Sequence, residues 1–422
     1  MVSQIVLSQW GTKIPAKEQA CRINLLMKHY NLFSLLILIG FLSTGKNAFA
    51  QQGFAIRQSM LIFPLQSEHV HASSVVRLPN GDYLTAWFQG TGERKADDAR
   101  IMGARLQKGD TAWSVPFGMA DTHGLPDCNP VLFLNNQGKL FLVWIAVQAN
   151  QWEASILRYR TTTDYRTPGP PKWTWQDDIL LKPDTAFSRS VAAGFGKLPD
   201  SAGWGAYALP YERLIGKAAA DPVKRSFGWM TRTPALILPS GRMLLPLYSD
   251  GFNLSIIAIS DDAGTTWRPS LPIVGKGNVQ PALLLKKDGT LVALMRDNGD
   301  APSRMQSATS PDQGETWSVA RKTTFPETAS VAAMVLKDGR WVLIANGQDN
   351  GRYQLGLYVS SDEGKTWNQA LVLEKAAMGK GSFSYPSIVQ DPSGMLHITY
   401  SYVPASGTES IKYVVVTPQA AR

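Results

Sequence analysis

Six times along the chain, two apolar runs flank a short polar turn that contains glycine. The first of these segments reads VVRLPNGDYLTAW and the last reads IVQDPSGMLHITY; the turn glycines are Gly81, Gly138, Gly241, Gly289, Gly339 and Gly394. Apolar runs on both sides of a tight turn are typical of an antiparallel β-hairpin, and glycine accepts the positive φ that such turns need. The pattern therefore predicts six hairpins.

The spacing of these turns indicates a repeat. Successive turn glycines lie 57, 103, 48, 50 and 55 residues apart, and periods of this size are typical of repeated supersecondary units. No strand–turn–strand pattern occurs between residues 178 and 230. The longest interval therefore predicts an inserted connection at about 178–230 rather than a seventh unit.

An octet with the pattern S-x-D-x-G-x-T-W follows three of the hairpins, as SDDAGTTW (260–267), SPDQGETW (310–317) and SSDEGKTW (360–367). Its aspartates are Asp262, Asp312 and Asp362, and a carboxylate at such a position accepts backbone N–H bonds within an Asx turn. A single ligand site does not need the same chemistry in several repeats. We therefore interpret the octets as structural turns that hold no metal.

Each hairpin is followed by a further apolar stretch and then by the octet or a remnant of it, so one unit consists of four strands. Six such sheets around an axis make an all-β, six-bladed β-propeller of four-stranded antiparallel sheets. The apolar stretch 53–61 is expected to complete the last sheet and close the ring. Residues 51–422 are accordingly expected to form one domain.

Residues 1–50 have the pattern of an N-terminal extension followed by a secretory signal peptide. Met27 and Lys28 precede the apolar run LFSLLILIGFL (32–42), and AFA ends at Ala50, a small-residue cleavage site. We expect translation to start at Met27 and cleavage to follow Ala50, with export to the periplasm or the medium. Eleven apolar residues are fewer than the roughly 20 needed to span a bilayer, so no stable membrane anchor is expected.

Charge and cysteine content narrow the range of functions. The formal net charge of the whole chain is +9, and residues 1–50 contain five of the 42 basic residues and one of the 33 acidic ones. The mild positive excess that remains suits an acidic ligand and does not indicate nucleic acid. Outside residues 1–50 the only cysteine is Cys128, expected as a buried apolar residue. No motif indicates a cofactor or a metal.

Alignment of the six units on their turn glycines predicts where their innermost strands begin. These starts fall at His71, Asn129, Thr233 beside Arg232, Gln280, Ser330 and Tyr385, allowing a slip of one residue. In a propeller the starts converge at one mouth of the axial channel, and polar residues there are candidates for ligand binding. Arg296 and Arg352, from neighbouring units, are expected at the same mouth, where guanidinium groups match a carboxylate.

Residues 65–415 resemble the Asp-box (BNR-repeat) sialidase superfamily, in particular its bacterial branch of predicted neuraminidases. The blocks that carry the resemblance include HASSVVRLPNGDYLTAWFQGT, QPALLL with LMRDNG, NGRYQLGLYVSSDEGKTW and YPSIVQDPSGMLHITYSY. The resemblance implies a six-bladed propeller, two of the three carboxylate-binding arginines at Arg296 and Arg352, a nucleophile at Tyr385, and an acid/base at Asp98.

The chain departs from that pattern at two positions. His71 or Ala72 stands where sialidases carry the first arginine, and Gln280 stands where they carry the glutamate that assists the tyrosine. A tyrosine is a poor nucleophile without a base beside it, and a glutamine cannot take its proton. His71, with an ordinary pKa near neutrality, is the candidate replacement base.

Three hypotheses about function remain open, each with an acidic glycan or oligosaccharide as partner. In the first, a sialidase-type exo-glycosidase acts on acidic sugar ends, with Tyr385 at the anomeric carbon and Asp98 as acid. In the second, a lyase cleaves uronates, with the arginines neutralising the carboxylate and with His71 and Tyr385 as base and acid. In the third, the propeller binds glycans without turnover; Arg232 and Asn129 would contribute to binding in all three.

Overall fold

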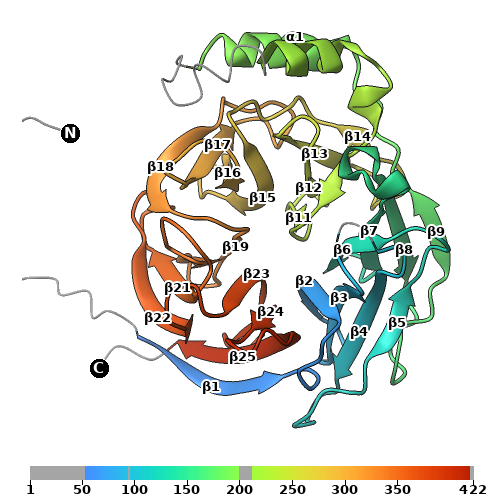
Figure 1. Ribbon diagram of the computed structural model, residues 1–422, viewed down its shortest axis with the longest axis vertical. Coiled ribbons are helices and arrows are strands. Elements are labelled where there is room, and N and C mark those ends of the chain that lie inside the picture. Colours follow the sequence, from blue (N-terminus) through green and yellow to red (C-terminus); the bar gives the residue numbers. More distant parts are fainter. Residues whose placement is uncertain (1–52, 94–95, 199–211, 419–422) are drawn as a thin grey trace, which may run out of the picture. The chain divides into compact units, whose positions relative to one another are not determined.

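The computed structural model describes residues 53–93, 96–198 and 212–418. The expected signal peptide and its cleavage site lie outside these residues. Within the described part of the chain, six antiparallel β-sheets stand side by side around a central axis (Figure 1). The predicted six-bladed β-propeller is therefore confirmed.

The blades follow one another in chain order, and in each the first strand lies nearest the axis (Figure 1). Blade 1 contains β2 (His69–Arg77), β3 (Tyr83–Gly90), β4 (Arg100–Leu106) and β5 (Phe117–Ala120). Blade 2 contains β6 (Asp127–Leu134), β7 (Leu140–Ala146), β8 (Ile156–Thr162) and β9 (Trp175–Asp178). Blade 3 contains β10 (Met230–Thr231), β11 (Leu236–Ile237), β12 (Met243–Ser249), β13 (Leu254–Ser260) and β14 (Arg268–Pro269).

The other three blades have the same order. Blade 4 contains β15 (Asn278–Leu285), β16 (Leu291–Asp297), β17 (Arg304–Ser310) and β18 (Arg321–Pro326). Blade 5 contains β19 (Ala332–Val335), β20 (Trp341–Ala345), β21 (Gln354–Ser360) and β22 (Asn368–Lys375). Blade 6 contains β23 (Ser382–Gln390), β24 (Leu396–Val403), β25 (Ser410–Pro418) and, as its outermost strand, β1 (Phe54–Leu61).

Pairing of the first strand with the last closes the ring. Strand β1 pairs antiparallel with β25 from Phe54 opposite Pro418 to Leu61 opposite Lys412. The Glu409 carboxylate adds a link from blade 6 to blade 1, because it accepts a bond from the Val70 backbone N–H at 2.7 Å. The expectation that residues 53–61 complete the last blade is confirmed.

All six predicted turn glycines adopt positive φ and lie in the turns that precede β3, β7, β12, β16, β20 and β24. The second strands are the most apolar: every residue of β7, β12 and β20 is buried. The tryptophans Trp87, Trp144 and Trp341 come from such strands and are fully buried, each in a different blade. Apolar packing between neighbouring blades is thus the main stabilising contribution.

Between β9 and β10 the chain leaves the sheets and forms helix α1 (Thr185–Phe195), with residues 212–220 also helical. Asp184 caps α1, since its carboxylate accepts the Ala186 N–H at 2.7 Å. Phe187 is buried against Trp229 and Phe252, with ring centroids 5.9 and 5.5 Å away. Short 3-10 helices lie in connections of the described chain: η1 (Gln148–Asn150), η2 (Trp152–Ala154) and η3 (Lys224–Ser226). No described helix has the length and apolar character needed to cross a membrane.

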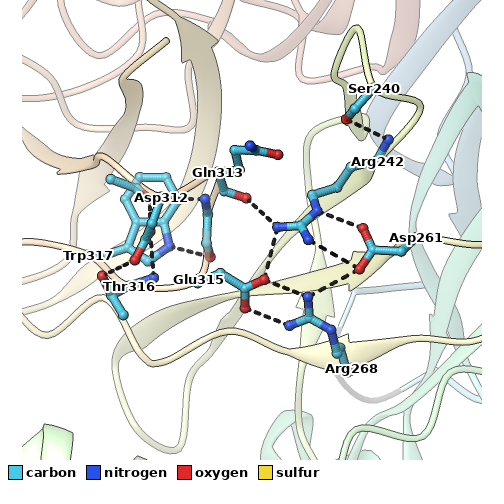
Figure 2. Close-up of polar contacts among 11 residues, drawn as sticks. Ser240, Arg242, Asp261, Arg268, Asp312, Gln313, Glu315, Thr316 and Trp317 are labelled. Atoms are coloured by element: carbon cyan, nitrogen blue, oxygen red, sulfur yellow. Dashed lines mark hydrogen bonds and ion pairs between the residues drawn. The ribbon is translucent and has the colours of Figure 1, made fainter.

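The octets form the turns between the last two strands of blades 3, 4 and 5. In blade 4, the Asp312 carboxylate accepts bonds from the Thr316 N–H at 3.0 Å, the Thr316 hydroxyl and the Ser310 hydroxyl (Figure 2). Asp262 and Asp362 accept bonds from the corresponding groups of their own turns. Despite a contribution from burial in the opposite direction, these bonds lower the pKa of all three aspartates, to about 2 for Asp362.

An ion network connects blade 3 to the octet of blade 4 (Figure 2). Arg242 donates to Asp261 at 2.7 Å and to Glu315 at 2.9 Å, and Arg268 contacts the same two carboxylates. Glu315 belongs to the octet and the other three residues belong to blade 3. Networks of bidentate arginines hold geometry better than isolated surface pairs do. The octet of blade 4 therefore also stabilises the contact between blades 3 and 4.

The octets should contribute to stability and not to ligand binding. Asp312→Ala removes the acceptor of three hydrogen bonds and should lower the free energy of unfolding by about 1–3 kcal/mol, measured by urea denaturation. Asp110→Ala, in the octet remnant of blade 1, is the control and should leave that free energy unchanged. An Asp312→Ala protein that stays folded but loses affinity for an acidic glycan would contradict this interpretation.

Candidate functional site

One backbone feature recurs at the axial mouth of four blades. The ladder between first and second strands shifts register in β2, β6, β15 and β23, as it does at a β-bulge. Within these shifts Ala72, Asn129, Gln280 and Tyr385 have φ between 52 and 58°. The bulges interrupt the strand alternation and so re-aim single side chains. Ala72, and not His71, is therefore the blade 1 equivalent of Asn129, Gln280 and Tyr385.

The Tyr385 hydroxyl lies at the centre of the group of predicted site residues. It accepts bonds from Gln280 Nε2 at 3.2 Å and Arg296 Nη1 at 3.3 Å. The Arg232 guanidinium carbon lies 4.7 Å from the ring centroid of Tyr385, and that of Arg352 lies 5.4 Å from it. Blades 3, 4 and 5 thus each bring one arginine to a tyrosine of blade 6.

The three guanidinium groups lack counter-ions in the described part of the chain, where no carboxylate pairs with them. Arg232 is buried, and its one hydrogen-bond acceptor among the described residues is the Pro386 carbonyl, at 2.8 Å. Burial lowers its pKa to about 10, although Tyr385 and Tyr248 act in the opposite direction. The Nε atoms of Arg232 and Arg296 and Oε1 of Gln280 are buried without a hydrogen-bond partner among the described residues. Such atoms mark a place where a ligand can bond.

A second tyrosine, which the sequence analysis did not single out, stands beside the first. The Tyr248 hydroxyl accepts bonds from Asn129 Nδ2 at 3.1 Å and Gln280 Nε2 at 3.4 Å. Tyr248 and Arg296 both follow their turn glycines, Gly241 and Gly289, by seven residues. This shared offset places both residues at the same height in adjacent blades. It is the sequence signal that could have identified Tyr248 as a site residue.

His71 lies against the ring of Tyr385, with centroids 4.1 Å apart and planes at 54°. Burial lowers the pKa of His71 well below its usual value, and the charges of Arg352, His69, Arg232 and Arg296 lower it further. The expectation that His71 titrates near neutrality is therefore wrong, and the imidazole is neutral there. The atoms that bond to the Tyr385 oxygen come from Gln280 and Arg296 and not from His71.

A cavity of about 330 Å³ lies at the axial mouth, and His71, Arg232 and Arg352 are not among the residues that line it. Asn129, Tyr248, Gln280, Arg296 and Tyr385 contribute to its wall. The rest of the lining comes from Glu93, Trp152, Asp250, Val279 and Asn298. Two carboxylates thus share the cavity with the arginine side, and sequence reasoning had singled out neither of them.

Asp98 does not line this cavity. Its carboxylate is exposed and accepts bonds from the backbone N–H and hydroxyl of Thr91, which lower its pKa. Asp98 therefore stabilises the connection between β3 and β4, and Glu93 is the residue of the described part of this connection that lines the cavity. No cluster of metal-ligating side chains occurs within residues 53–93, 96–198 and 212–418.

The chain is similar to a known protein family in sequence and to solved structures in fold. The family model of the BNR repeat-like domain matches residues 81–202 and 219–398. No curated protein sequence matches the chain. A Dyadobacter fermentans protein of unknown function has a similar structure, with a TM-score of 0.65, 16% identity, and coverage of 87% of this chain and 100% of that one.

Sialidase structures are also similar. The NanB sialidase of Streptococcus pneumoniae gives a TM-score of 0.60 at 12% identity, covering 84% of this chain and 70% of NanB. A leech intramolecular trans-sialidase gives 0.61 at 13% identity, covering 85% and 70% of the two chains. At such identities the likeness concerns the fold, whereas the family match covers more than half of the sequence. The chain belongs to the BNR repeat-like domain family and has the propeller fold of the Asp-box sialidase-like superfamily.

Proposed function

We propose that this protein is an exported exo-glycosidase of sialidase type that acts on carboxylate-bearing terminal sugars. The observation that carries the proposal is the set of three guanidinium groups around Tyr385 without counter-ions among the described residues. Burying a charge without a partner is unfavourable. A bound carboxylate offsets that cost, and a guanidinium fork matches its two oxygens.

In this proposal Tyr385 is the residue that acts on the sugar. Its oxygen lies at the cavity wall and accepts two bonds, from Gln280 and from Arg296. Donors aimed at an oxygen stabilise negative charge on it. That charge in turn stabilises the positive charge that develops at an anomeric carbon when the glycosidic bond breaks. Tyr385 therefore attacks or stabilises the anomeric carbon in this proposal.

Elimination from a uronate is the second candidate, and the surroundings of Tyr385 favour it. Gln280 stands where a sialidase has a glutamate, and His71 is held neutral beside the Tyr385 ring. A neutral imidazole can remove the proton next to a carboxylate that the arginines neutralise. The bond to the leaving oxygen then breaks, a C=C bond forms in the sugar, and a phenol supplies the proton for that oxygen. Such chemistry needs no carboxylate at the tyrosine.

The product of the reaction distinguishes the candidates. We expect the purified protein to release acidic monosaccharide from sialosides or glucuronide-ended oligosaccharides, with Tyr385→Phe lowering the rate by about 10²-fold or more. An unsaturated product that absorbs in the ultraviolet identifies the lyase instead. Binding without either product leaves a glycan-binding propeller and contradicts both enzymatic proposals.

Binding of the ligand carboxylate should depend on the forked shape of the Arg296 guanidinium and not on its charge alone. Arg296→Lys should weaken binding of the acidic sugar by about ten-fold or more, because it loses a charge-assisted hydrogen bond worth about 1.5–3 kcal/mol. Isothermal titration measures the affinity, and Arg57→Lys on the exposed face of β1 is the matched control. Equal affinities for the sugar and its carboxyl-reduced analogue would contradict a carboxylate-binding site.

The lowered pKa of His71 predicts a pH-dependent loss of stability. As the pH falls below about 6.5, the unfolded chain binds a proton at this histidine that the folded chain does not, so folding becomes less favourable. His71→Asn should flatten the fall in unfolding free energy between about pH 7 and pH 5.5, by at most about 1.4 kcal/mol per pH unit.

Urea denaturation at the two pH values measures this change in slope. His123→Asn is the control, because His123 is exposed and does not contact the site. The wild-type slope should persist in that variant. Parallel slopes for wild type and His71→Asn would show that His71 takes up its proton equally in both states.

A further inference from the structure

Tyr248 combines three properties that the proposed function does not yet use. It projects from β12 into the wall of the axial cavity and is buried. Its oxygen accepts bonds from two amides, those of Asn129 and Gln280. A phenol that accepts from two donors still has its own proton to give. Among the described residues no acceptor bonds to that proton, so it is available to a molecule in the cavity.

The surroundings of the two tyrosines differ in charge. Tyr385 accepts a bond from the Arg296 guanidinium, and two further guanidinium groups lie near its ring. Tyr248 accepts bonds from neutral amides only, and Asp250, two residues further along the chain, lines the same cavity. Burial, and then the charges of Asp250 and Tyr385, raise the pKa of Tyr248 above its usual value.

Paired titratable groups in opposite environments are typical of an acid and its partner in catalysis. The arginine side favours an oxygen that bears negative charge, which suits Tyr385. Burial and the nearby carboxylate favour a phenol that keeps its proton, which suits Tyr248. The side chain of Gln280 connects the two, since its Nε2 donates to both hydroxyls.

We propose that Tyr248 is the proton donor to the leaving oxygen of the acidic sugar bound at Tyr385. The inference rests on the proposed glycosidase function. As the bond between the anomeric carbon and the leaving oxygen breaks, its electron pair stays on that oxygen, which takes the Tyr248 proton. While the Tyr385 oxygen stabilises the positive charge at the anomeric carbon, water adds to that carbon and gives one proton to the Tyr248 phenolate. The amides of Asn129 and Gln280 stabilise that phenolate while it exists.

The test compares leaving groups in Tyr248→Phe, which removes the hydroxyl alone. Two probes share one acidic sugar, N-acetylneuraminic or glucuronic acid, and carry either 4-nitrophenol or methanol as the leaving group. On the methyl glycoside kcat should fall about 10²–10⁴-fold, whereas on the 4-nitrophenyl glycoside it should fall less than about ten-fold. Nitrophenolate departs without a proton, so a role in protonation affects the two probes differently.

Tyr400→Phe is the matched control. Tyr400 is a buried tyrosine on the second strand of blade 6, and its hydroxyl donates to Glu374 at 2.7 Å, away from the cavity lining. Both variants lose one buried hydroxyl, so thermal unfolding of the two separates a folding defect from a catalytic one. Only Tyr248→Phe should show the dependence on the leaving group.

The possible outcomes separate the inference from the function on which it rests. If the parent protein hydrolyses both probes and Tyr248→Phe slows them equally, or slows neither, the assignment of Tyr248 is overturned and the glycosidase proposal stands. If the parent protein hydrolyses neither probe, the proposed function fails and the inference fails with it. A selective loss on the methyl glycoside supports both.

Discussion

Closure of the ring is the constraint on which the axial site depends. A propeller blade packs only against its two neighbours, so the positions of side chains at the axis are fixed once the last blade meets the first. Here the pairing of β1 with β25 completes blade 6. Between blades 1 and 6, the Ala72 and Val75 N–H groups donate to the hydroxyls of Ser401 and Ser387. These links bring His71 of blade 1 against Tyr385 of blade 6.

The electrostatics of the axial site are set by the charged side chains that several blades bring to it. Three guanidinium groups come from three blades, whereas Glu93 and Asp250 reach the cavity from connections in blades 1 and 3. In the described residues the arginines are not neutralised by a carboxylate, and a buried cation such as Arg232 is unfavourable without a partner. The fold keeps this arrangement because the apolar contacts between blades supply stability elsewhere. A carboxylate that binds at the axis removes this unfavourable electrostatic free energy, so the unpaired arginines favour ligand binding.

A shared fold does not by itself determine the chemistry. The sialidase structures resemble this chain over most of its length at 12 and 13% identity. At the tyrosine, however, this chain places an amide where the resemblance leads one to expect a glutamate. Gln280 donates to both Tyr385 and Tyr248, so one side chain sets the separation of two phenols. The site is best understood from these contacts and not from its relatives.

The sequence by itself determined the blades and their order. The turn glycines, the octets and the apolar runs are local signals, and each acts within a few residues through φ preferences, Asx turns and strand alternation. The same signals placed Asn129, Gln280, Arg296, Arg352 and Tyr385 at one mouth of the channel, since register along a strand can be counted from its turn.

Tertiary structure decided which of those side chains meet and in which state. Asp98 lies outside the cavity because Thr91 holds its carboxylate, and Glu93 lines it instead. Tyr248 belongs to the site because blade 3 packs beside blade 4, and His71 is neutral because burial and three arginines surround it. Burial and charge sum over groups up to hundreds of residues apart in the chain. A local sequence pattern therefore does not predict the protonation state of His71 or the lining of the cavity, because both depend on groups that meet only once the ring has closed.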